Sequence, residues 1–127
     1  MVRVLLDSNV VLFALLRPAR LSIAAREALE NPAHSFFISA ATWYEIGWKV
    51  RLGKLALPPF RTVDDAARLL TANPVNITPA HMARAAELPP DNRDPFDRMI
   101  VAQALEEGFL LLSADAGLDL LGAPRLW

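Results

Sequence analysis

The chain has 127 residues, of which 54% are hydrophobic and 21% charged, with a formal net charge of -1 and no cysteine. This apolar content and small net charge exclude an intrinsically disordered chain. The absence of cysteine excludes disulfides, a thiol nucleophile and cysteine-ligated zinc. The longest uncharged apolar run, Val10 to Leu16, is too short for a transmembrane helix of about 18 residues.

Apolar runs and helical patterns alternate along the first half of the chain. The runs are short, as expected for strands buried in a parallel sheet. In chain order we expect a strand at residues 2–6, a helix at 10–16, a helix at 23–30 capped by Ser22, a strand at 36–38, a helix at 43–52 capped by Ser39 or Thr42, and a break at Pro58-Pro59.

The second half continues the alternation. We expect a helix at residues 64–72, a strand at 75–77, helices at 79–88 and 96–107, a strand at 109–112 and an edge strand at 125–127. Asp94-Pro95 begins and Gly108 ends the best-defined helix. The pattern predicts an α/β fold over residues 1–127 as one domain, with three layers (α/β/α) around a parallel sheet of four to five short strands.

Acidic residues lie where this fold would bring strand ends together. Ligands of an open parallel sheet bind outside the carboxyl ends of its strands, where the strand order reverses. Asp7 and Asp115 each follow a strand, Glu45 lies near the start of a helix that leaves a strand, and Asp94 and Asp97 begin a helix that leads into one. We therefore expect these five carboxylates at one edge.

Most of these acids also have an ordinary structural explanation. Asp7 can cap the following helix, Glu45 can pair with Lys49 one turn later, and Asp94 suits an N-cap with Asp97 completing a capping box. Repulsion within a carboxylate cluster nevertheless requires a compensating cation. Oxygen-only ligands favour Mg²⁺ or Mn²⁺, and such an ion indicates metal-dependent phosphodiester hydrolysis.

Several stretches resemble the PIN-domain family, and more narrowly the VapC-type toxins of bacterial type II toxin–antitoxin pairs. They are Leu5-Leu6-Asp7-Ser8-Asn9, SAATWYEI at 39–46, RLGKL at 51–55, RDPFDR at 93–98 with AQA at 102–104, Ser113-Ala114-Asp115, and the terminal Leu126-Trp127. The resemblance spans essentially the whole chain. The DPFDR stretch with its AQA helix is the most specific part.

The resemblance implies a Mg²⁺- or Mn²⁺-dependent endoribonuclease in which activated water attacks the phosphorus. It gives metal binding and catalysis to Asp7, Glu45, Asp97 and Asp115, and supporting roles to Asp94, Asn9 and Ser113. Relatives often have histidines where this chain has Asp91-Asn92, which removes a possible histidine contact with RNA but no carboxylate. His34 and His81 are expected outside the site.

Basic residues are concentrated in the first half of the chain. Residues 1–61 contain eight Lys/Arg and four Asp/Glu, whereas residues 62–127 contain five and ten. Each basic residue can be an ordinary solvated charge, yet an acidic pocket that accepts RNA needs nearby cations. The candidates for phosphate contacts are Arg17, Arg20, Lys49, Arg51, Lys54 and Arg98.

The helix expected at residues 43–52 is apolar on two stripes. One contains Trp43, Ile46 and Val50, and the other Tyr44, Trp48 and Leu52. One stripe serves the core, and the other is available for a dimer interface or an antitoxin helix unless the helix is wholly buried. The resemblance implies a homodimer, a cognate antitoxin and an RNA substrate. With no membrane segment or secretory signal in the sequence, we expect a cytoplasmic protein.

Other classes of protein with acids at strand ends fit less well. A phospho-acceptor receiver domain needs a lysine after a late strand, and no lysine follows Lys54. A haloacid-dehalogenase-like phosphatase needs an acid where Asn9 stands. One alternative stays open, a catalytically inactive PIN-fold protein that binds RNA or a partner, although the four intact candidate ligands argue against it.

Overall fold

The structure is a computed structural model that describes residues 2–56 and 62–127, so the expected break at Pro58-Pro59 lies outside the described residues. Within these ranges the strands form one parallel sheet in the order β3-β2-β1-β4-β5. They are β1 (Arg3–Leu6), β2 (Ser35–Ser39), β3 (Asn73–Val75), β4 (Leu110–Leu112) and β5 (Arg125–Leu126). The order reverses between β1 and β4, which makes the carboxyl ends of these two strands the expected ligand-binding edge.

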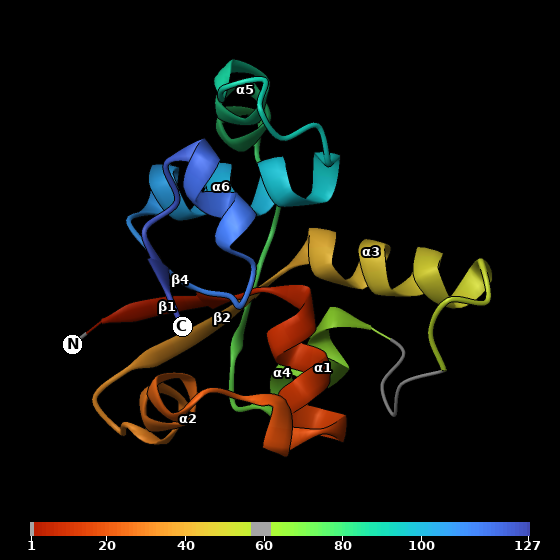
Figure 1. Cartoon of the computed structure of the whole chain (residues 1–127), viewed down its shortest axis with the longest axis vertical. Helices are drawn as coiled ribbons and strands as arrows, with labels where there is room; N and C mark the ends of the chain where they lie inside the picture. The colour runs from red at the N-terminus through yellow and green to blue at the C-terminus, as the bar shows by residue number, and fades with distance from the viewer. Residues whose placement is uncertain (1, 57–61) are drawn as a thin grey trace.

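Helices cover both faces of the sheet (Figure 1). One side carries α1 (Ser8–Leu16), α2 (Ile23–Glu30) and α4 (Val63–Leu69), and the other carries α5 (Pro79–Glu87) and α6 (Pro95–Glu107). The helix α3 (Ala40–Arg51) leaves the end of β2 and contacts α1, α4 and α6. Two short 3-10 helices, η1 (Pro18–Arg20) and η2 (Ala116–Leu121), complete the described elements. The predicted three-layer α/β/α fold is confirmed.

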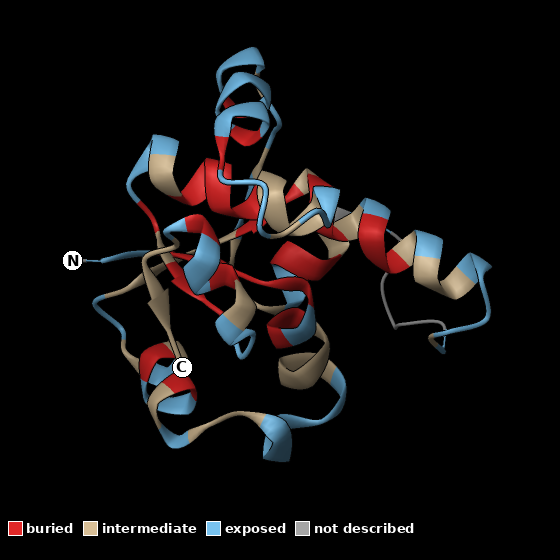
Figure 2. Cartoon of the chain, turned by 45° about the horizontal axis from the view of Figure 1, so that its top comes forward, coloured by how far each residue is buried: buried red, intermediate tan, exposed pale blue. Residues whose placement is uncertain are grey.

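The central strand supplies side chains to a core on each face of the sheet. Val4 and Leu6 pack into the core beneath α1, α2 and α4, whereas Leu5 packs into the core formed with α5, α6 and η2. All three side chains are fully buried, and buried residues gather on the central strands (Figure 2). Burial on both faces explains why the first strand is a mostly apolar run without polar alternation.

The third strand lies two residues earlier than predicted. It occupies Asn73–Val75, and it pairs with β2 through Pro74 opposite Ile38. Proline has no N–H to donate, but Pro74 is tolerated because β3 is an edge strand whose outer side needs no donor. No described helix has the length and apolar character that crossing a membrane requires.

Two helix starts are set by polar residues at strand ends. The helix predicted from Val10 begins at Ser8, because Asp7 is its N-cap and accepts the N–H of Ser8 at 2.7 Å. For α3, Ser39 rather than Thr42 is the cap, and its Oγ accepts the N–H of Ala41 at 3.0 Å. Both helices therefore begin directly at the carboxyl ends of their strands, which brings their first turns to the expected ligand-binding edge.

Candidate functional site

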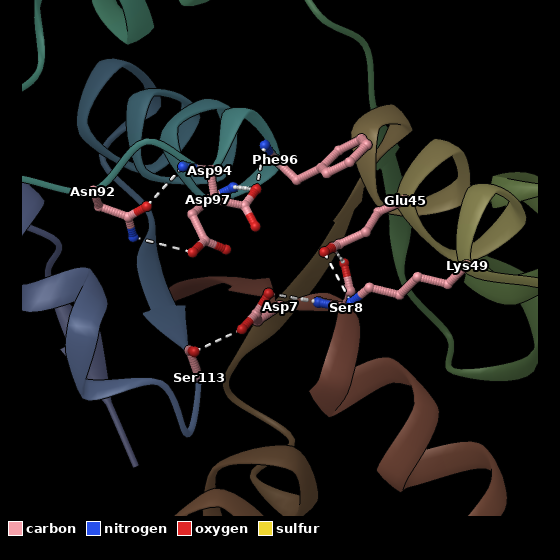
Figure 3. A network of polar contacts seen from close by, with 9 residues as sticks. All are labelled: Asp7, Ser8, Glu45, Lys49, Asn92, Asp94, Phe96, Asp97 and Ser113. Carbon is pink, nitrogen blue, oxygen red and sulfur yellow. Dashed lines mark hydrogen bonds and ion pairs between the residues drawn. The ribbon is translucent and has the colours of Figure 1, made fainter. Parts of the chain in front are cut away.

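The carboxyl ends of the central strands open into a small polar pocket of about 140 Å³ (Figure 3). Its lining residues are Asp7, Ser8, Asn9, Glu45, Lys49, Asp94, Asp97 and Asp115. All five acids expected at this edge thus line one pocket, although they come from four separate segments of the chain. The predicted supporting residue Asn9 is exposed at its rim.

Asp7 lies between the first strand and the first helix and is almost buried, with 7% of its surface exposed. Its Oδ1 accepts the N–H of Ser8, and its Oδ2 accepts the hydroxyl of Ser113 at 2.6 Å. Burial raises the pKa of Asp7, and the charges of Glu45 and Asp115 raise it further. Asp7 therefore caps α1, which confirms its predicted structural role, and it also faces other carboxylates across the pocket.

Glu45 reaches the same pocket from the second turn of α3 and is also almost buried. The hydroxyl of Ser8 donates to Glu45 Oε1, while the N–H of Ser8 donates to Asp7, so Ser8 fixes both carboxylates (Figure 3). Lys49 Nζ lies 3.1 Å from Glu45 Oε2, which is the predicted pair one turn apart. The sequence interpretation missed Ser8, although its place at the first position of α1 was the available signal.

Asp94 and Asp97 approach the pocket from the start of α6. Asp94 is the predicted N-cap, and its Oδ1 accepts the N–H groups of Phe96 at 2.8 Å and Asp97 at 3.2 Å. The predicted capping box is wrong, because Asn92 takes the place of the Asp97 side chain. Asn92 Oδ1 accepts the N–H of Asp94 at 2.9 Å, and Asn92 Nδ2 donates to Asp97 Oδ2 at 3.1 Å.

The Asp97 carboxylate is consequently held towards the other acids rather than against its own helix (Figure 3). Burial raises the pKa of Asp97 to about 6, despite the opposing hydrogen bond from Asn92, and the nearby charges of Asp94, Asp7 and Asp115 act in the same direction as burial. Sequence reasoning treated Asn92 only as a lost histidine, and its position two residues before the helix cap was the signal that could have identified it.

Asp115 follows β4 and is exposed. Its Oδ1 accepts the N–H of Gly117 at 2.8 Å, and a Cβ on residue 117 would lie 2.9 Å from that oxygen, so a side chain there would disturb the cap of η2. The fully buried Ser113 accepts the N–H of Asp115 at 3.1 Å while it donates to Asp7. Ser113 therefore links two of the acids, in keeping with its predicted supporting role.

The donors lining this pocket suit a hard divalent cation. Carboxylate, hydroxyl and amide groups and the Lys49 ammonium surround it with no histidine or thiol, and such oxygen ligands favour Mg²⁺ or Mn²⁺ over zinc or copper. Across residues 2–56 and 62–127, no three acidic or histidine side chains already converge tightly enough to enclose an ion. Mg²⁺ usually keeps several waters, so acids spread around a pocket still fit such an ion. Burial is the main cause of the raised pKa values of Asp7 and Asp97, and the charges of neighbouring acids add to it.

The six candidate phosphate contacts differ in their hydrogen bonds and in their distance from the acidic pocket. Arg98 has a structural role, because its guanidinium donates to the carbonyls of Ala85, Leu88, Pro89 and Asn92 at 2.6–2.9 Å. Those bonds hold the loop between α5 and α6 in place.

Two further candidates lie beside the pocket. Arg17 and Lys54 line a second hollow of about 330 Å³ that shares Asn9 with the acidic pocket. Arg20 and Arg51 are exposed and line neither hollow. Of the six candidates, Lys49 alone lines the acidic pocket within the described part of the chain.

Comparisons with known proteins agree with this geometry. The family profile described as PIN domain matches residues 4–123. Ribonuclease VapC22 from Mycobacterium tuberculosis is 36% identical over an alignment of 128 positions, and the alignment covers 98% of this chain and 96% of that protein.

Solved structures share the fold at lower identity. The crystal structure of VapBC2 from Rickettsia felis bound to a DNA fragment from their promoter has a TM-score of 0.70 and 12% identity, and covers 98% of this chain and 97% of that chain. The crystal structure of FitAcB from Neisseria gonorrhoeae has a TM-score of 0.62 and 19% identity, and covers 98% and 96%. The chain therefore belongs to the PIN-domain family and to its VapC-type members.

Proposed function

We propose that this protein is a divalent-metal-dependent endoribonuclease and the toxin of a toxin–antitoxin pair. The observation that carries the proposal is the polar pocket in which Asp7, Glu45, Asp94, Asp97 and Asp115 meet. The 36% identity to a protein named a ribonuclease supports RNA as the substrate. A catalytically inactive binding protein would have no need to keep five carboxylates together against their mutual repulsion.

Asp7, Glu45, Asp97 and Asp115 would hold one or two Mg²⁺ or Mn²⁺ ions. When bound, such an ion lowers the pKa of water and neutralises charge that develops on the phosphate. Ser8, Ser113 and Asn92 hold three of these carboxylates in place by hydrogen bonds. Both serine hydroxyls position carboxylates in this arrangement, and the nucleophile of the proposed reaction is water.

The test is cleavage of a single-stranded RNA pool by the protein purified free of any antitoxin. Reactions with Mn²⁺ or Mg²⁺ are compared with reactions in EDTA, and the Asp7→Asn variant controls for contaminating ribonuclease. We expect cleavage that requires metal and disappears in the variant. Equal cleavage by both proteins would mean either a contaminating ribonuclease or an active site outside this pocket. RNA binding without cleavage by either would favour the inactive binding protein.

The partners are proposed from an exposed apolar surface on α3. In the stripe of Trp43, Ile46 and Val50, the Ile46 side chain is fully buried, and those of Trp43 and Val50 are partly buried. The other stripe is open, and its exposed fractions are 66% for Tyr44, 49% for Trp48 and 47% for Leu52. The predicted second apolar stripe therefore does not belong to the core, and an exposed surface of this kind marks a protein interface.

We infer that the exposed stripe of α3 joins two copies of the chain, and that a cognate antitoxin binds the dimer in the cytoplasm. Tyr44 also stacks edge-on against Phe96, with ring centroids 5.4 Å apart, which extends the apolar surface from α3 to the start of α6. Light scattering should give the mass of a dimer for the native chain and of a monomer for Trp48→Ser. A monomeric native chain would refute this interface.

A further inference from the structure

Lys49 is the one cation that lines the acidic pocket among the described residues. It stands one turn after Glu45 on α3, and its ammonium lies 3.1 Å from Glu45 Oε2. Its side chain extends along the helix towards Ser8 and the carboxylates (Figure 3). This position places a mobile positive charge beside a group of acids that otherwise repel one another.

The pair differs from an ordinary surface ion pair in the burial of its acid. The Glu45 side chain is 8% exposed and that of Lys49 is 41% exposed. By contrast, Arg84 and Glu106 form a pair with both side chains at least one-third exposed, at 43% and 36%. A buried carboxylate requires a nearby donor or cation, because water no longer solvates it fully. Glu45 has the hydroxyl of Ser8 on one oxygen and Lys49 on the other.

A divalent ion in the pocket would need an oxygen of Glu45 that Lys49 now occupies. Ser8 already donates to Oε1, so an ion held by Glu45 would compete with Lys49 most directly at Oε2. The long, half-exposed lysine side chain can leave at small cost, because its stem is flexible and its ammonium returns to water or finds another anion. The anion that enters such a pocket with RNA is a phosphate.

We propose that Lys49 is an exchangeable counter-ion of Glu45: it neutralises the buried carboxylate without metal, gives way when a divalent ion binds, and then contacts a phosphate of the RNA. The phosphate contact rests on the proposed nuclease function. The exchange between Lys49 and a divalent ion concerns metal binding alone and is tested without RNA. Lys49 thereby becomes a specific candidate for substrate contact among the basic residues.

The first experiment titrates Mn²⁺ into metal-free protein by calorimetry. Lys49→Gln should bind Mn²⁺ about two- to fivefold more tightly than the native chain, because a competing cation has been removed. Lys49→Arg should retain the native affinity, since it keeps the charge. Arg84→Gln is the matched control, because it also removes one charge from a half-exposed ion pair, and its affinity should not change. Unchanged or weaker binding by Lys49→Gln would overturn the exchange.

The second experiment measures single-turnover RNA cleavage at saturating Mn²⁺. Lys49→Gln should cleave about tenfold more slowly in spite of its tighter metal binding, whereas Lys49→Arg and Arg84→Gln should cleave at nearly the native rate. Opposite changes in metal affinity and cleavage are not expected from a merely structural lysine. Native cleavage by Lys49→Gln would overturn the phosphate contact. Absence of cleavage by the native chain would instead refute the nuclease, while the titration still decides the exchange.

Discussion

Two buried polar networks lie on different sides of this small fold. The acidic network consists of Asp7, Ser8, Glu45 and Ser113 at the carboxyl ends of the strands. The histidine network consists of Thr78, His81, Gln103 and Glu107, and it joins α5 to α6. Both contain polar side chains with almost no exposed surface, so burial alone does not distinguish them.

The networks differ in whether their polar groups attract or repel one another. His81 Nδ1 accepts the N–H of Thr78 at 3.1 Å, and its Nε2 lies 2.8 Å from the half-exposed Glu107, so one tautomer satisfies both ring nitrogens. In the acidic network, Asp7 and Glu45 repel each other beside a pocket lined by three more acids. Crowded like charges at a pocket, rather than buried polar groups as such, therefore distinguish the candidate site.

The largest expected effect comes from neutralising an acid of the pocket. Asp97→Asn should lower RNA cleavage by about a hundredfold or more, since losing a metal ligand costs at least as much as losing one of its supporting residues. Its free energy of unfolding at neutral pH should stay level or rise, because a repelling charge is removed. Asp64→Asn, an exposed change on α4, serves as the control. Native cleavage by Asp97→Asn would remove that residue from the site.

Disrupting the histidine network should produce the opposite result. His81→Ala removes a fully packed ring and leaves the N–H of Thr78 without its acceptor. We expect the free energy of unfolding to fall by about 2–4 kcal/mol, while cleavage per folded molecule stays native. Urea denaturation followed by an activity assay at a temperature where the variant is folded separates the two quantities. A specific loss of cleavage would place His81 in the functional machinery.

The pH dependence of stability without metal also distinguishes the acidic network from the histidine network. The folded chain raises the pKa of Asp97 from 3.8 to about 6, so it holds that proton more tightly than the unfolded chain does. Stability should therefore fall as pH rises from about 4 to about 6.5, and the Asp7 shift acts in the same direction. Urea denaturation in EDTA should show a flatter pH profile for Asp97→Asn. An equally steep profile would contradict the raised pKa of Asp97 in the folded chain.

The smallest effect is expected within the histidine network itself. Gln103 is fully buried, yet its Oε1 has no hydrogen-bond partner, and its Nε2 lies 3.4 Å from both Asn76 O and His81 Nδ1. Gln103→Met should change the free energy of unfolding by less than about 1 kcal/mol and leave cleavage unaltered. A larger loss in urea denaturation would mean that the amide contributes more than these long contacts suggest.

The sequence was most informative where a residue's role follows from its place along a strand or helix. The rule for parallel strand ends predicted that Asp7, Glu45 and Asp115 would share one edge, because the strand order reverses beside β1. Asp94 and Gly108 were recognisable as caps, and Gly108 indeed adopts the left-handed conformation with φ of 72°. Such features depend on a few neighbouring residues and on a general property of parallel sheets.

The missed features depend on which side chain reaches a given partner. Ser8 bridges Asp7 to Glu45, which lies 37 residues after Ser8 along the chain, and Asn92 replaces the expected Asp97 contact at the start of α6. Arg98 has the charge of a phosphate contact, yet four backbone carbonyls occupy its guanidinium. Composition and spacing do not reveal these contacts, because they depend on which side chains and carbonyls become neighbours in the folded chain.

The most direct measurement compares the urea stability of the native chain and Asp7→Asn, each in EDTA and in Mn²⁺. Burial and neighbouring acids raise the pKa of Asp7, so the variant should be the more stable protein in EDTA at neutral pH. Mn²⁺ should stabilise the native chain and leave the variant nearly unchanged, because only the intact pocket binds the ion. A variant that is less stable in EDTA, or equal stabilisation of both proteins by Mn²⁺, would contradict a metal site built on crowded carboxylates.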